Sequence, residues 1–395
     1  MQLQFTIDDA LEWAVADTID VSLLRRRMEQ GEKLTVKLGI DPTSPSVHLG
    51  RTLPLWRLRA FQELGHTIVF IIGDFTGQVG DTSDKDSERP MLSAEQVEVN
   101  LVGYFEQVWK VLDPTKRELV SIRRNSEWLN KLSFSEVGRL ADAFSVQSFI
   151  KRELIAKRLD AGSRVSLREM LYPLMQGYDS VVVGADVEVG GTDQRFNLLA
   201  GRTLQEQSGV KPQAIIMNPL LPGTDGRKMS SSWGNVISLT DSPADLFGKI
   251  MSIADTLIEQ YLLFIPRSAQ PFTVEELQMK FRSGENPRNS KILLASCLVE
   301  LYFGLEQAKK EREAFESRFA DKRPDRSVTA EAGTLLFNFI TSDAQWQDSR
   351  TELRRIFQAG GVEWDGRKIT DTEAVVEKGT HTLKVGKRIL VKVTA

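Results

Sequence analysis

The sequence has very few of the residues that form covalent cross-links or metal sites. Its 395 residues include one cysteine, Cys297, and three histidines. A single cysteine excludes an internal disulfide and a cysteine-rich zinc site. Because Cys297 lies in the apolar run 292–299, we predict a buried structural thiol; the alternative is a reactive one.

Long hydrophobic runs and a strong excess of one charge are also missing. No apolar run reaches the roughly 18 residues of a membrane helix, and the N-terminus shows no charged-then-apolar signal segment. Both observations favour a cytoplasmic protein. With a net charge of −3, any nucleic-acid contact must come from local basic patches. The remaining composition, 41% hydrophobic and 27% charged, is that of a globular chain with room for two or three domains.

The stretch 35–80 predicts a βαβ unit. Residues 35–40 read as a strand and 67–72 as a strand buried on both faces, because the second run is unbroken and apolar. Between them, 48–64 has helical apolar spacing. The loop 41–47 directs the N-terminus of that helix at any bound ligand, and such an end suits a phosphate. We therefore predict an α/β fold with a parallel sheet and a site at the carboxyl ends of its strands.

The middle of the chain alternates helical and strand patterns. Residues 93–171 read as an amphipathic helical insertion, 181–189 and 213–217 as strands, and 219–232 as a flexible loop rich in glycine and serine.

The last third reads as two further parts. Residues 242–318 are helical in pattern, and 321–327 are charged and linker-like. Beyond the linker, 352–361 predicts a basic helix, and two alternating strands meet at Gly386.

Four motifs in order give the chain a family resemblance. They are Asp41-Pro-Thr with His48-Leu-Gly-Arg, Tyr172-x-x-x-Gln176-x-x-Asp179, Gly190-Gly-Thr-Asp-Gln194, and Lys228-Met-Ser-Ser-Ser. Together they resemble the class I aminoacyl-tRNA synthetases, and among these the bacterial tyrosyl enzymes, over essentially the whole chain. The C-terminal part resembles the S4 RNA-binding module.

The resemblance implies a fold and a domain plan. Residues 1–235 would be a Rossmann-like catalytic domain with a helical insertion at about 93–171. Residues 236–322 would be an all-α anticodon-recognition domain, and 328–395 a small α+β S4-like domain.

The implied activity is that of a tyrosine–tRNA ligase, which forms tyrosyl-adenylate and pyrophosphate from tyrosine and ATP and then charges the 3′ end of tRNA(Tyr). Mg²⁺ would arrive on the nucleotide, with no protein-bound zinc. The partners would be tRNA(Tyr), L-tyrosine and ATP, with no membrane, and the chain would form a homodimer through the insertion.

The resemblance also assigns residues. The ATP-binding residues would be Asp41, Thr43, His48, Gly50, Arg51, Asp193, Lys228, Met229, Ser230, Ser231 and Ser232. Those with a catalytic role would be His48, Arg51, Lys228, Ser231 and Lys85. Tyrosine would be bound by Lys37, Asp81, Tyr172, Gln176, Asp179 and Gln194. RNA would be bound by Arg354, Arg355, Lys384, Lys387 and Arg388.

Three of these positions depart from the family pattern. Arg51 replaces the second histidine of the first signature; we interpret it as a phosphate ligand, and a side chain turned to solvent is the alternative. Ser231 replaces the second lysine of the last signature. Lys37 stands where another branch of the family has tyrosine, and it would pair with Asp179, leaving the second ligand of the substrate hydroxyl open.

Two other functions remain open at this stage. One is the tryptophanyl enzyme of the same family. The other is a catalytically silent relative that binds structured RNA, which the changes at Arg51 and Ser231 suggest.

Overall fold

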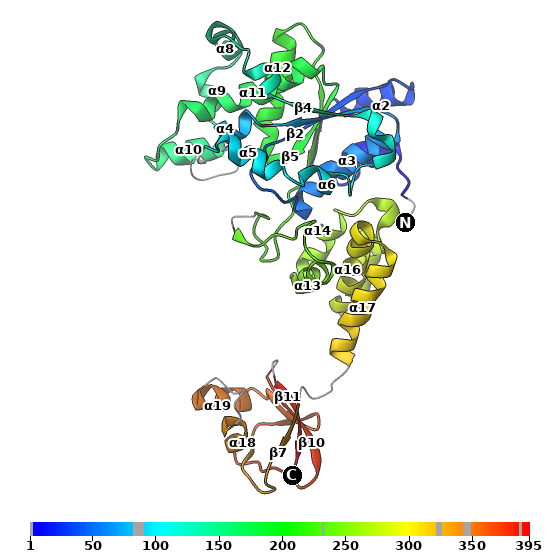
Figure 1. Ribbon diagram of the computed structural model, residues 1–395, viewed down its shortest axis with the longest axis vertical. Helices are drawn as coiled ribbons and strands as arrows, with labels where there is room; N and C mark the ends of the chain where they lie inside the picture. The colour runs from blue at the N-terminus through cyan, green and yellow to red at the C-terminus, as the bar shows by residue number, and fades with distance from the viewer. Residues whose placement is uncertain (1–2, 82–90, 231–232, 321–325, 343–348, 387–388) are drawn as a thin grey trace. The chain divides into compact units, whose positions relative to one another are not determined.

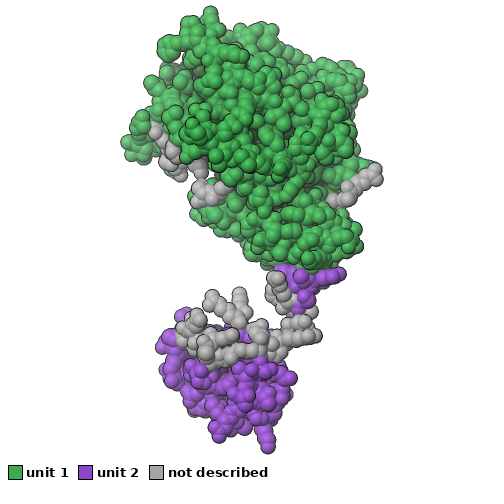
Figure 2. Space-filling model, in the orientation of Figure 1, with its two compact units in different colours: residues 1–312 green, residues 313–395 purple. Residues whose placement is uncertain are grey.

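The computed structural model describes residues 3–81, 91–230, 233–320, 326–342, 349–386 and 389–395. The predicted site residues Lys85, Ser231, Ser232, Lys387 and Arg388 lie outside these ranges. The chain divides into two compact units, residues 1–312 and residues 313–395 (Figure 2). The proposed boundary at 235/236 falls inside the first unit, so the three-domain plan stays a prediction.

The first unit is built on a six-stranded sheet with the order β1-β6-β5-β2-β3-β4. The strands are β1 (Asp17–Ile19), β2 (Thr35–Ile40), β3 (Thr67–Ile72), β4 (Val120–Arg124), β5 (Val187–Gly191) and β6 (Ala214–Asn218). All neighbouring strands run parallel except β1, which is antiparallel to β6. The predicted α/β fold with a parallel sheet is confirmed.

Helices cover both faces of this sheet (Figure 1). They are α1 (Ile7–Leu11), α2 (Val21–Glu29), α3 (Thr52–Glu63), α4 (Thr76–Val79), α11 (Leu167–Val183) and α12 (Arg195–Gln207). The predicted crossover helix is α3, which follows the 3₁₀ turn η1 (Leu49–Arg51). On the other face α11 and α12 pack closely, since a Cβ on Gly177 would lie 2.9 Å from the backbone carbon of Ala200.

The segment between α4 and α11 is mostly helical. Its helices are α5 (Ala94–Leu101), α6 (Tyr104–Val108), α7 (Ser126–Leu129), α8 (Phe134–Ala141), α9 (Val146–Ile150) and α10 (Glu153–Asp160). It also contains β4, so the all-helical prediction for 93–171 was wrong at that strand. The strand is an edge strand whose residues are all at least partly exposed, and so it lacks the buried apolar run that revealed β3. The prediction of strand at 181–183 was also wrong, because α11 continues to Val183 and ends at the left-handed Gly184.

The helical prediction for 242–318 is confirmed. Five α-helices follow the sheet: α13 (Pro243–Ser252), α14 (Ile258–Leu262), α15 (Val274–Arg282), α16 (Pro287–Phe303) and α17 (Leu305–Ala320). Cys297 on α16 is buried, with Sγ 2.9 Å from the carbonyl oxygen of Ala269. Burial raises the pKa of this thiol to about 12, so it is the structural thiol that we predicted. Within the described ranges, no helix has the length and apolar character needed to cross a membrane.

The second unit has a five-stranded sheet with the order β7-β11-β10-β8-β9. Its elements are β7 (Arg326–Thr329), α18 (Leu336–Ser342), α19 (Arg350–Gln358), β8 (Val362–Trp364), β9 (Arg367–Ile369), β10 (Thr380–Val385) and β11 (Ile389–Thr394). Buried side chains including Leu353, Phe357 and Val391 pack between helices and sheet. The predicted basic helix is α19, and the two predicted strands are β10 and β11.

Candidate active site

The carboxyl ends of the parallel strands gather most of the predicted site residues at one edge of the sheet. Asp41 follows β2, Thr76 follows β3 and Asp193 follows β5. Lys228 lies in the loop after β6. In open α/β sheets, ligands bind in the crevice outside the carboxyl ends of the strands.

A chain of hydrogen bonds joins the predicted ATP residues to the predicted tyrosine residues. The Tyr172 hydroxyl donates to Oδ2 of Asp41 at 2.8 Å, and the Thr76 hydroxyl donates to Oδ1 of the same carboxylate at 2.7 Å. Asn125 Nδ2 then donates to the Thr76 hydroxyl oxygen at 3.0 Å and to Asp179 Oδ2 at 3.3 Å. Burial, with help from Asp41, raises the pKa of Tyr172 well above its usual value, so this phenol stays protonated and donates.

Asp179 is the buried acid at the end of this chain. It is 3% exposed and accepts a hydrogen bond of 2.8 Å from Trp128 Nε1. Burial raises its carboxyl pKa to about 7, although the Lys37 charge and the bonds from Trp128 and Asn125 oppose the shift. Its carboxylate is therefore only partly formed at neutral pH. Each hydrogen bond that its oxygens accept favours the ionised form, and a ligand hydroxyl could donate a further one.

Sequence reasoning missed Asn125 and Trp128. Both follow β4, Asn125 directly and Trp128 within α7. Each contacts Asp179 only because β4 pairs with β3 and brings its carboxyl end to the site. The signal that could have located these two residues was strand β4, but the sequence prediction assigned that strand to the helical insertion.

Gln194 and Asp81, two further residues predicted to bind tyrosine, form a second polar pair. Gln194 Nε2 donates to Asp81 Oδ2 at 2.7 Å, and Gln194 Oε1 accepts from Asn197 Nδ2 at 2.9 Å. Gln194 belongs to the 3₁₀ turn η3 (Thr192–Gln194), and Asp81 is buried. Two residues predicted to bind the polar end of tyrosine are thus in direct contact.

Lys37 does not occupy the predicted place. It is fully buried, and its ammonium lies 3.0 Å from Glu188, 2.7 Å from the Ser180 hydroxyl and 2.8 Å from the Gln176 carbonyl. The predicted pairing with Asp179 was therefore wrong, because the ion pair is with Glu188. All three N–H donors are used, so Lys37 has none left for a substrate hydroxyl.

His48 begins the turn η1 at the predicted phosphate site. Burial lowers its pKa to about 3, and the charges of Arg51 and Lys228 add to the shift, so the imidazole is neutral at pH 7. Its Nδ1 is buried with no hydrogen-bond partner among the described residues. A Cβ on Gly50 would lie 3.0 Å from that nitrogen, so glycine keeps the space beside the ring open.

Arg51 points at a second predicted ATP residue. Its guanidinium lies 3.4 Å from the Thr43 hydroxyl and 3.3 Å from the Tyr104 hydroxyl. Within the described ranges, its guanidinium contacts are these two hydroxyls, with no carboxylate partner. A half-buried arginine without a carboxylate partner is suited to bind an anion.

Lys228 lies against Asp193, the predicted ribose ligand, with Nζ 2.8 Å from Oδ2. Asn235 holds the loop in shape, since its Oδ1 accepts from the Ser230 N–H at 2.9 Å and its Nδ2 donates to the Lys228 carbonyl at 3.1 Å. The Met229 side chain is buried and its N–H donates to the Leu221 carbonyl. Met229 therefore anchors the loop.

The predicted RNA residues that the structure describes lie on α19 and β10. The Arg354 guanidinium lies 5.6 Å from the ring centre of Phe337. Arg355 pairs with Glu352 at 3.0 Å, and Lys384 with Glu363 at 2.9 Å.

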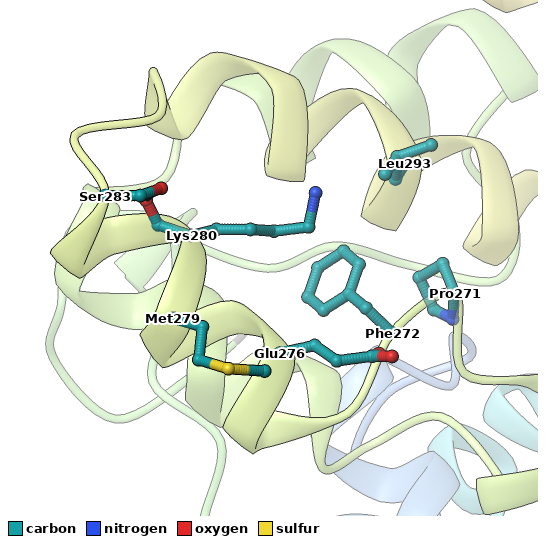
Figure 3. Close-up of a pocket in the computed structure, with 7 residues that line it drawn as sticks. All are labelled: Pro271, Phe272, Glu276, Met279, Lys280, Ser283 and Leu293. Carbon is teal, nitrogen blue, oxygen red and sulfur yellow. Dashed lines mark hydrogen bonds between the residues drawn. The ribbon is translucent and has the colours of Figure 1, made fainter.

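A separate groove of about 470 Å³ lies on the helices after the sheet (Figure 3). It is lined by Pro271, Phe272, Glu276, Met279, Lys280, Ser283 and Leu293. None of these belongs to the predicted site. Within the described part of the chain, no group of three or more His, Cys, Asp or Glu side chains is arranged to hold a metal ion.

Comparisons with known proteins show the family of the chain. Residues 28–320 match the family described as tRNA synthetases class I (W and Y). The chain is 43% identical over 385 residues to a tyrosine–tRNA ligase of Carboxydothermus hydrogenoformans, covering 94% of this chain and 93% of that protein. It is also 43% identical over 377 residues to that of Haemophilus influenzae, covering 94% and 92%.

Solved structures share the fold. The tyrosyl-tRNA synthetase of Archaeoglobus fulgidus, complexed with L-tyrosine, superposes with a TM-score of 0.61 at 24% identity, over 78% of this chain and 98% of that one. A C-terminally truncated mitochondrial tyrosyl-tRNA synthetase of Aspergillus nidulans gives 0.63 at 22% identity, over 79% and 94%.

Proposed function

The chain belongs to the class I tRNA synthetases of the tryptophan and tyrosine family, and from that premise we propose how its site performs the reaction. The chain is a tyrosine–tRNA ligase, as its relatives over more than nine-tenths of its length are. It activates tyrosine with ATP, and then transfers the tyrosyl group to the 3′ end of tRNA(Tyr).

One observation carries the assignment of the site. The Tyr172 hydroxyl lies 2.8 Å from Asp41, so a residue that we assign to tyrosine directly contacts the loop that we assign to the nucleotide. We call the proposed tyrosine-binding region around Asp179 the tyrosine slot. Positions 172, 176 and 179 share one face of α11. The amino-acid carboxylate would then lie between the slot and the phosphates, as adenylate formation requires.

The first step needs no activated side chain. The tyrosine carboxylate, already ionised, attacks the α-phosphorus of ATP in line. A new carboxyl–phosphate bond forms as the bond to the β-phosphate bridging oxygen breaks, and that electron pair leaves with pyrophosphate. Catalysis therefore rests on positioning and on stabilising charge on the phosphates.

The charges at the nucleotide end suit this task. His48 is neutral, so it can donate a hydrogen bond to a phosphate without carrying charge, whereas Arg51 and Lys228 supply positive charge. We place Mg²⁺ on the nucleotide, because this ion keeps several waters and is held through phosphate oxygens in such sites. Asp193 would accept hydrogen bonds from the ribose hydroxyls once Lys228 no longer pairs with it.

The remaining partners follow from the other parts of the chain. The exposed basic side chains of α19 and β10 would bind tRNA phosphates, and the helices from α13 to α17 would contact the anticodon. Apolar side chains on the insertion favour a homodimer through that surface, since Phe134 is 94%, Leu167 78% and Val146 65% exposed. A sedimentation measurement of Phe134→Glu against the wild-type protein tests it. We propose that the enzyme acts in the cytoplasm, where tRNA and ATP are available to it.

The direct test is amino-acid-dependent exchange of pyrophosphate into ATP, run with tyrosine and with tryptophan side by side. We expect exchange with tyrosine alone. Exchange with tryptophan would select the other branch of the family. Salt-sensitive binding of tRNA with no exchange by folded protein would mean a silent RNA-binding relative.

A further inference from the structure

A buried ion pair lies beneath the tyrosine slot, in the layer between the sheet and α11. Lys37 on β2 and Glu188 on β5 are paired neighbours in the sheet. Their side chains are 0% and 1% exposed and approach to 3.0 Å. The reaction proposed above uses neither of them directly. An ion pair in such a position is costly to desolvate and is therefore weak evidence for stability alone.

The Lys37–Glu188 pair forms hydrogen bonds to one turn of α11, residues 176–180. Lys37 Nζ donates to the Gln176 carbonyl at 2.8 Å and to the Ser180 hydroxyl at 2.7 Å. Glu188 accepts from the Gln176 side-chain amide at 3.2 Å and from the Ser180 hydroxyl at 3.1 Å. Residues 176 and 180 enclose Asp179, so both ends of the turn that faces tyrosine are tied to the sheet.

The surrounding packing leaves this turn little freedom. Gln213 at the start of β6 donates a further hydrogen bond to Glu188. A Cβ on Gly201 of α12 would lie 2.6 Å from the Gln213 amide nitrogen and 2.9 Å from the Ser180 hydroxyl. The polar cluster thus fills the space between α11, α12 and the sheet, and any shift of the pair must move the turn.

We propose that Lys37 and Glu188 are positioning residues that hold the Gln176–Ser180 turn of α11, and that they thereby set the affinity and selectivity of the enzyme for tyrosine. The inference rests on the proposed function, because it assigns these two residues to the tyrosine end of that site. They act through Gln176 and Asp179, and neither touches the substrate.

The test compares Lys37→Met, Glu188→Gln and the double variant. Each single change leaves a buried group without its counter-ion and lowers the melting temperature, whereas the double variant is neutral and recovers it. If the pair were merely structural, tyrosine binding would recover with it. We expect instead that KM for tyrosine stays raised about tenfold in the double variant, the size of the loss of about one hydrogen bond. KM for ATP stays unchanged, and the preference for tyrosine over phenylalanine falls.

Glu169→Gln is the matched control. Glu169 forms a second buried ion pair, with Arg158, whose side chains are 0% and 3% exposed and 2.5 Å apart. This control should lose stability and keep its KM for tyrosine.

Two results would overturn the proposal: a wild-type KM for tyrosine in the double variant, or an equal rise of KM for tyrosine and ATP. Should these variants fail to fold, Ser180→Ala removes the hydroxyl that links the pair, and an unchanged KM for tyrosine would overturn the proposal as well. Wild-type protein without tyrosine-dependent exchange would instead refute the proposed function.

Discussion

The ammonium group of Lys228 lies 2.8 Å from the carboxylate of Asp193. The two residues come from different motifs, and both are expected to bind ATP. The two charges neutralise each other, although each side chain is partly exposed. If ATP binds as we propose, it separates the pair, because Asp193 then contacts the ribose and Lys228 the phosphates.

Removing the cation of this loop should slow activation. We expect Lys228→Ala to lower the single-turnover rate of tyrosyl-adenylate formation by about 10²–10³, the usual size of one transition-state charge contact. Lys280→Ala is the control, since Lys280 pairs with Glu285 at 3.1 Å and is 31% exposed, as is Lys228. An unchanged rate for Lys228→Ala would remove this lysine from the catalytic step.

The indole of Trp128 should contribute to tyrosine recognition through Asp179. Trp128→Phe keeps an aromatic side chain but removes the indole N–H, whose nitrogen lies 2.8 Å from the carboxylate. Because this bond lowers the pKa of Asp179, its loss should raise that pKa further and increase KM for tyrosine about tenfold at pH 7. Trp13→Phe is the matched control, because Trp13 is also buried and its Nε1 has no hydrogen-bond partner among the residues that the structure describes. Equal effects of the two substitutions would argue against the role of Trp128.

We expect the buried Asp179 to lower the stability of the folded protein, although it contributes to substrate binding. Its pKa in the folded protein, about 7, is raised above the ordinary aspartate value of 3.8. The native state therefore holds its proton more tightly, and stability falls as pH rises between these values. Asp179→Asn removes this cost, so its melting temperature relative to wild type should increase from pH 5 to pH 8. The same variant should lose its preference for tyrosine over phenylalanine. A pH-independent difference in melting temperature would contradict the raised pKa.

Arg51 should act on ATP. Arg51→Ala removes the guanidinium beside Thr43, and we expect kcat/KM for ATP to fall about 10- to 100-fold, as for loss of one or two charge-assisted hydrogen bonds. Arg51→His restores the family's second histidine and should retain more activity. KM for tyrosine serves as the internal control. Indistinguishable ATP kinetics in all three proteins would show that the side chain serves no ligand.

The basic side chains of the second unit should act on RNA alone. Arg354→Ala or Lys384→Ala should weaken tRNA binding and reduce the slope of log affinity against log salt by about one. Lys309→Ala on α17, whose lysine pairs with Glu306 at 3.0 Å, is the control. Pyrophosphate exchange should be unaffected in all three. A slope equal to that of wild type would exclude a phosphate contact.

Local patterns were sufficient for much of the fold. The strands β2 and β3, the crossover helix α3, the helical character of 242–318 and the basic helix α19 were predicted from their own residues, because apolar period, caps and glycine stops act within a few positions of the chain. The order of the four motifs likewise identified the family, which the comparisons confirm.

The sequence by itself determined which residue types lie at the ends of the strands, because these residues follow their strands directly in the chain. Only the tertiary structure decided which side chains these residues contact. Asp179 accepts a hydrogen bond from Asn125, 54 positions away, and Lys37 pairs with Glu188 instead of Asp179. The physical reason is that an edge strand such as β4 carries no strong apolar pattern, and a buried charge takes whichever counter-ion the sheet register places opposite it.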